Sequence, residues 1–209
     1  MNDSIKSFTL CSPGGCGSAR MVYCLEKNGL IRVYPSQYDK YTSKICIDNH
    51  RRVPPKNSSN KILYMYADPR DILLSSLNRG ASNDWAWSHC VHLEGNLNYF
   101  DRFTSKVTIK EILKDGIDPF GLEEHFLNWL NSEIHYELML LKYESLEDSN
   151  VFQKVLDFFE VDGNYTYDWR PRKTSYLNLP KEQQIEITKL FNNLLKIQSS
   201  VDSVLIRKP

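Results

Sequence analysis

The chain has 209 residues, of which 41% are hydrophobic and 12% aromatic. This length and composition exclude a disordered chain and suit one domain, because folding should bury roughly 70% of the unfolded chain's surface. The 26 basic residues balance the 26 acidic ones, which excludes a global field that would attract nucleic acid or anionic lipid but permits a local basic site. We therefore expect a single domain, residues 1–209, that binds neither nucleic acid nor membrane.

The cysteines and the apolar runs indicate the compartment. The five cysteines are scattered, and none forms a CxxC pair, which favours a reduced protein over a disulfide framework. No apolar run approaches the roughly 18 residues that span a bilayer, and the N-terminus lacks the apolar segment of a signal peptide. These features predict a cytoplasmic protein, and they indicate nothing about its oligomeric state.

The first elements are a strand, a glycine-rich turn and a helix. Ser7–Ser12 reads as a short strand, and it runs into the turn Pro13–Ser18. Ala19–Lys27 has apolar residues at helical spacing, and Gly29 follows as a stop. Further short strands are expected at Ile31–Tyr34, Lys44–Asp48 and Lys61–Tyr66.

The next segment begins with a well-marked helix. Asp68 suits its N-cap, Pro69 its first position and Gly80 its end, which predicts a helix over Pro69–Arg79. Ala81–Phe103 is the least legible part of the sequence, with little periodicity. Its tryptophans and histidines, Trp85, Trp87, His89 and His92, either face an acceptor or pack in the core or a loop.

The second half continues the alternation of strands and helices. A capping box at Thr108–Glu111, with Gly116 as a stop, predicts another helix. The later elements are helix Leu122–Asn131, strand Tyr136–Lys142, helix Val151–Phe159, the basic and aromatic stretch Gly163–Ser175, and helix Lys181–Ser199. This order predicts a three-layer α/β/α fold around a central parallel sheet of four or five strands. Such sheets usually bind ligands at the loop after the first strand.

The glycines of that loop favour an anion. Gly14, Gly15 and Gly17 can adopt positive φ, and the free N–H groups at the following helix start attract phosphate. A tight turn without a ligand remains the alternative. The loop matches neither GxxxxGK[ST] nor GxGxxG, which disfavours a nucleotide kinase or NTPase and a dinucleotide-binding enzyme.

Five segments share their order with a known family. They are Ser12–Ser18, Tyr66–Ser75, Asp118–Trp129, Leu141–Leu146 and Arg170–Lys173. Together they resemble the sulfotransferases, which move a sulfuryl group from PAPS (3′-phosphoadenosine 5′-phosphosulfate) to a hydroxyl or amine. The resemblance implies a P-loop-like fold, PAPS as donor, PAP as product, no metal, and a small-molecule or glycan acceptor.

The resemblance also assigns binding roles to individual residues. The loop would hold the 5′-phosphosulfate, Ser75 and the basic cluster the 3′-phosphate, and Tyr143 the adenine. A core tyrosine and a solvated basic loop are the alternatives. The complete expected set is Gly14, Gly15, Cys16, Gly17, Ser18, Ala19, Arg20, Ser75, Tyr143, Arg170, Arg172 and Lys173.

Two departures from the family pattern bear on activity. Gly15 stands where the family has a loop Lys, and Ala67 stands where it has an Arg for the 3′-phosphate. A lost cation at the leaving oxygen typically costs a few kcal/mol of transition-state stabilisation. Arg20, Arg70 and Lys173 are candidates to compensate. The alternatives are a catalytically degenerate PAP-binding protein and a P-loop kinase-like phosphotransferase that uses Mg²⁺ and ATP.

A histidine is the candidate base. His50 matches the histidine of the family's K-T-H segment, with Asp48 at the lysine position, and imidazole suits proton transfer near neutral pH. A surface histidine at a strand end is the alternative. The short spacing of His89, Cys90 and His92 does not favour a metal site.

A second group of titratable residues lies on the helix expected at Leu122–Asn131. Glu123, Glu124 and His125 are consecutive there. We expect them to form a solvated face.

Overall fold

The sheet at the centre of the molecule has five strands. The structure, a computed structural model, describes residues 6–33, 50–79, 84–100, 102, 107–163 and 165–209. The strands are β1 (Ser7–Cys11), β2 (Ile31–Arg32), β3 (Ile62–Tyr66), β4 (Leu138–Lys142) and β5 (Val204–Arg207). Their order across the sheet is β2-β1-β3-β4-β5.

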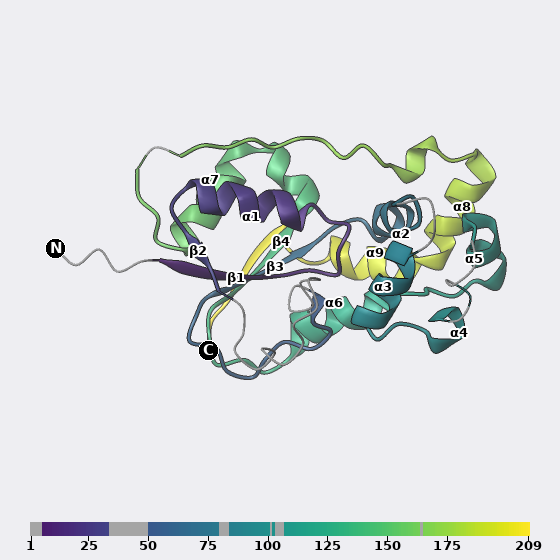
Figure 1. The fold of residues 1–209 in the computed structure, drawn as a ribbon, viewed down its shortest axis with the longest axis horizontal. Coiled ribbons are helices and arrows are strands. Elements are labelled where there is room, and N and C mark those ends of the chain that lie inside the picture. The colour runs from purple at the N-terminus through teal and green to yellow at the C-terminus, as the bar shows by residue number, and fades with distance from the viewer. Residues whose placement is uncertain (1–5, 34–49, 80–83, 101, 103–106, 164) are drawn as a thin grey trace.

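The direction of the strands confirms the fold class with one correction. β2, β1, β3 and β4 are parallel, as expected. β5, which the sequence did not reveal, pairs antiparallel with β4, so the sheet is mostly rather than wholly parallel. Every residue of β3 is buried, because helices cover both faces of such a sheet. Figure 1 shows α1 and α7 on one side and α6 on the other.

The helices follow most of the predicted bounds. They are α1 (Ser18–Lys27), α2 (Pro69–Leu77), α3 (Asp84–His92), α4 (Leu97–Phe100), α5 (Ile109–Asp115), α6 (Leu122–Asn131), α7 (Ser149–Phe158), α8 (Lys181–Leu190) and α9 (Asn192–Ser199). Asp68 caps α2 by accepting the Arg70 N–H at 3.0 Å, and the capping box of α5 is present. None of the described helices is long and apolar enough to cross a membrane.

Other predictions need correction. Ala81–Phe103, where the sequence shows little periodicity, contains α3 and α4. The last helix is two helices, because Phe191 leaves helical geometry with φ −103° and ψ 14° while its side chain is buried. The predicted strand Lys44–Asp48 and the stop at Gly80 lie outside the described residues.

The topology brings distant segments to one edge of the sheet. The carboxyl ends of β1 and β3 lead into α1 and α2, and Tyr143 follows β4 directly. The segment 165–179 runs along the upper side of Figure 1 to the same edge. The glycine loop, α2 and the basic segment therefore meet there.

Candidate functional site

The loop between β1 and α1 is built of glycines for two reasons. Gly14, Gly15 and Gly17 have φ values of 80°, 62° and 75°, a region that side chains disfavour. A Cβ at Gly17 would lie 2.3 Å from the Tyr143 ring, and one at Gly14 would lie 2.1 Å from His89 Nε2. Both conformation and close packing therefore require glycine at these two positions.

The start of α1 has no side-chain cap. Gly17 is the N-cap and provides no side chain, so the N–H groups of Ser18 and Ala19 have no partner within the helix. The first turn contains no acidic residue. The positive end of the helix dipole and these donors together favour an anion.

Arg172 supplies positive charge beside the loop. Its Nη1 donates to the Gly15 carbonyl at 2.9 Å, and its guanidinium lies 4.8 Å from the Tyr143 ring centre. Nη2 is buried without a hydrogen bond, 3.6 Å from Glu144 Oε1. Arg172 therefore retains a donor for a further anionic group.

The other residues expected at the 3′-phosphate do not all lie at the loop. Ser75 lies next to the loop, with its Cβ 3.5 Å from the position of a Cβ at Gly15. Lys173 is exposed. The Arg170 side chain is 71% exposed and forms an ion pair with Asp168 at 3.1 Å. Arg172 and Ser75 thus meet at the loop, whereas Arg170 lies at the rim of a neighbouring pocket.

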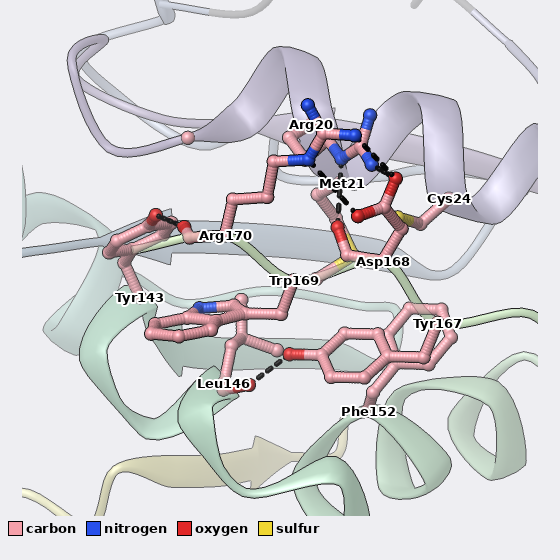
Figure 2. A pocket seen from close by; sticks show the side chains of 11 residues that line it. Arg20, Met21, Cys24, Tyr143, Leu146, Phe152, Tyr167, Asp168, Trp169 and Arg170 are labelled. Carbon is pink, nitrogen blue, oxygen red and sulfur yellow. Dashed lines mark hydrogen bonds and ion pairs between the residues drawn. The ribbon is translucent and has the colours of Figure 1, made fainter. Parts of the chain in front are cut away.

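That neighbour, the aromatic pocket, adjoins the loop at Gly17. It has a volume of about 280 Å³, including solvent at its mouth. Figure 2 shows Trp169, Tyr167 and Phe152 below the arginines of the rim. The indole N–H of Trp169 is buried and has no partner, and Tyr143 Oη donates to the Arg170 carbonyl at 2.7 Å. The pocket is lined by Gly17, Arg20, Met21, Cys24, Tyr143, Leu146, Phe152, Tyr167, Asp168, Trp169 and Arg170. Its aromatic walls and buried donor suit a flat heterocycle.

Two arginines expected to compensate for the missing loop Lys are already paired. Arg20 Nε donates to the Asp168 carbonyl at 2.8 Å, and its Nη2 forms an ion pair with the Asp168 carboxylate (Figure 2). Arg70 donates to Asp68 at 2.9 Å and to Thr188 Oγ1 at 3.1 Å. Neither guanidinium is therefore free to take over the role of a loop Lys.

His50, the candidate base, lies against the start of the loop. Its Nδ1 is 2.7 Å from the Ser12 carbonyl oxygen. A carbonyl only accepts, so Nδ1 carries the proton and Nε2 carries the lone pair. Burial lowers the pKa of His50 to about 4, although the bond to Ser12 opposes this. The imidazole is neutral at pH 7 and can accept a proton at Nε2.

α3 brings two more imidazoles to His50. The ring of His89 lies 5.1 Å from that of His50, and the ring of His92 lies 6.3 Å away. Ser76 Oγ is 3.2 Å from His89 Nδ1, and burial lowers the pKa of His89 to about 3. Within the described residues, no three His, Cys, Asp or Glu side chains are placed to hold a metal.

The predicted solvated face of α6 is wrong for His125. This side chain is buried, and Tyr64 Oη lies 2.9 Å from its Nδ1. Leu122, Phe126 and Trp129 are buried on the same face. The spacing i, i+3, i+4, i+7 was the signal that could have placed His125 in the core.

The comparison with known families decides the identity. The sequence matches the model of the Sulfotransferase domain family over residues 22–198. The chain belongs to the sulfotransferase family. A search of curated proteins found no match.

This sulfotransferase departs from its family at the loop. The match begins inside α1, so the loop is aligned by its place between β1 and α1. Where the resemblance expects a Lys, the residue is Gly15, and the adjacent charge comes from Arg172. Sequence reasoning missed the apolar wall of the aromatic pocket, which the alternating aromatics Tyr165, Tyr167 and Trp169 could have indicated.

Proposed function

We propose that this protein is a PAPS-dependent sulfotransferase that acts on a hydroxyl or amine. The observation that carries this proposal is the junction of the aromatic pocket with the start of α1. The two share Gly17, and Tyr143 packs on that residue and also lines the pocket. A ligand that joins a flat base to an anionic group fits such a junction better than a free anion or a simple aromatic molecule.

The binding roles follow from this arrangement. The adenine would lie in the aromatic pocket against Tyr143, with Trp169 N–H as a donor. The phosphosulfate would accept hydrogen bonds from the N–H groups at the start of α1 that have no partner within the helix. The 3′-phosphate would accept hydrogen bonds from Arg172, Ser75 and Lys173, because Nη2 of Arg172 is buried and makes no hydrogen bond.

In the chemical step PAPS supplies the sulfuryl group, and His50 handles the proton. The acceptor oxygen or nitrogen forms a bond to sulfur while the bond from sulfur to the bridging oxygen breaks. That oxygen leaves with the electron pair on the 5′-phosphate of PAP. His50 Nε2 takes the acceptor proton, which its neutral state permits at pH 7.

The first test substitutes His50. We expect His50→Asn to lower turnover by about 10²–10⁴-fold, because general-base catalysis contributes that much, while the affinity for PAP stays nearly unchanged. Isothermal titration with PAP and a donor-consumption assay over a panel of acceptors measure the two quantities. His135→Asn is the control, since this histidine is exposed. Full turnover in His50→Asn would remove His50 from the mechanism.

A second candidate function is PAP binding without catalysis. The observation that favours it is the pairing of Arg20 with Asp168 and of Arg70 with Asp68. Neither arginine can then replace the positive charge that a Lys at the position of Gly15 would supply. Binding of PAP with no turnover on any acceptor supports it. The kinase-like alternative instead predicts Mg²⁺-dependent ATP binding with no preference for a 3′-phosphate.

A further inference from the structure

Arg79 belongs to the cluster of rings around the candidate base. It follows α2 closely, and its guanidinium lies 5.1 Å from the centre of the Trp85 ring. Trp85 is 5.0 Å from the His89 ring, and His89 is 5.1 Å from the His50 ring. This chain of contacts connects Arg79 to His50 through Trp85 and His89.

Arg79 differs from Arg20 and Arg70 in having no anionic partner. It forms no ion pair or hydrogen bond within the described residues, and its side chain is exposed. Its charge nevertheless reaches the loop, because it interacts electrostatically with Cys16 and Arg172. It is therefore a cation that remains available near the loop.

Two arginines add positive charge near His50. Burial is the main cause of its lowered pKa, and electrostatic interactions with His92, Arg79 and Arg32 lower it further, of which only the arginines are charged at pH 7. Arg79 also contributes to the lowered pKa of His89, after burial and the interaction with His50. No carboxylate contributes to either shift within the described part of the chain, so the field near His50 favours an anion.

We propose that Arg79 binds the sulfuryl group of the donor near His50 and supplies charge that Gly15 does not. This inference rests on the proposed function. A guanidinium offers several donors in a plane and can hold two sulfuryl oxygens at once. As the bond to the bridging oxygen breaks, the guanidinium keeps the sulfuryl group oriented toward the acceptor, and its charge offsets the negative charge that develops on the leaving oxygen.

The test compares PAP with PAPS, because only PAPS carries the sulfuryl group. The variants are Arg79→Gln and Arg79→Lys, and Lys154→Gln is the control because it removes an exposed cation on α7. We expect Arg79→Gln to leave PAP affinity unchanged and to weaken PAPS affinity about tenfold, as the loss of one charge-assisted hydrogen bond would. Turnover should fall by about 10²-fold, with partial recovery in Arg79→Lys. Thermal melts verify that the variants are folded.

The possible outcomes separate the two proposals. Wild-type protein that binds neither PAP nor PAPS overturns the proposed function, and the role of Arg79 falls with it. Binding of both PAP and PAPS by the wild-type protein supports the proposed function. In that case an unchanged ratio of PAPS to PAP affinity in Arg79→Gln overturns the role of Arg79, whether or not catalysis occurs. A purely structural role would change both affinities equally and would leave the ratio unchanged.

Discussion

Gly17 and Gly29 share a backbone conformation but differ in what surrounds them. Their φ values are 75° and 84°. A Cβ at Gly17 would meet the Tyr143 ring at 2.3 Å, whereas nothing lies within 4 Å of a Cβ at Gly29. The pair therefore separates the cost of backbone conformation from the cost of losing close packing at the site.

This difference gives a prediction for alanine substitutions. Gly29→Ala should lower the free energy of unfolding by about 1–2 kcal/mol, the cost of a side chain in the left-handed region, and should leave PAP binding unchanged. Gly17→Ala should cost more, because Tyr143 must move, and it should also weaken PAP binding. Urea denaturation and PAP titration measure both effects. Equal losses of stability in the two variants would contradict the packing role of Gly17.

At the same scale, sequence reasoning found residues better than it found their partners. The loop glycines and His50 carry local signals. The partner of Arg20 is Asp168, 148 residues away, and nothing in the neighbourhood of either residue indicates the pair. Because such pairing decides which cations remain free, the available charge could be found only from the folded chain.

At the scale of elements, the strength of the terminal signals decided which helices were predictable. α2 and α5 begin at side-chain caps, Asp68 and Thr108, that act within a few residues. The residue before α3 lies outside the described part of the chain, so its cap is not described. Three buried residues of this helix, Ala86, His89 and Cys90, follow a helical spacing together with Leu93, which lies just beyond its end. Alanine, cysteine and histidine, however, form no conspicuous apolar stripe. The apolar pattern of this helix is therefore too weak to predict it from the sequence.

The capping box of α5 allows a quantitative test. Thr108 Oγ1 accepts the Glu111 N–H at 3.4 Å, and Glu111 Oε2 accepts the Thr108 N–H at 2.7 Å. Thr108→Ala should lower the free energy of unfolding by about 0.5–2 kcal/mol. Thr108→Ser keeps the oxygen and should restore most of the loss. Chemical denaturation provides the measurement, and a Ser variant as unstable as the Ala variant would rule out the cap as the cause.

At the scale of the whole molecule, buried histidines should make stability depend on pH. Burial lowers the pKa of His50 to about 4 and those of His89 and His125 to about 3. In the unfolded chain a histidine titrates near 6.5. As the pH falls below that value, the histidines of the unfolded chain bind protons while those of the folded chain stay neutral. Stability is therefore lost between about pH 6.5 and pH 4.

The expected size of this effect is large enough to measure. Each such histidine contributes about 1.4 kcal/mol per pH unit, and the three together up to about 4 kcal/mol per pH unit. Denaturation curves between pH 7 and pH 5 test the slope. His89→Asn should reduce it, and His135→Asn, which changes an exposed histidine, should not. Constant stability across this range would show that the cluster takes up protons without unfolding.

The segment that carries Asp168 and Arg172 has a consequence for how the site is assembled. Arg172 bonds to Gly15, 157 residues earlier, and Arg20 bonds to Asp168. Contacts so distant along the chain slow folding, because a long loop must close before they form. On the ribosome, β1, the glycine loop and α1 emerge well before Tyr167, Trp169 and Arg170, which line the aromatic pocket. The nascent chain should therefore have no nucleotide affinity until residue 172 has left the exit tunnel.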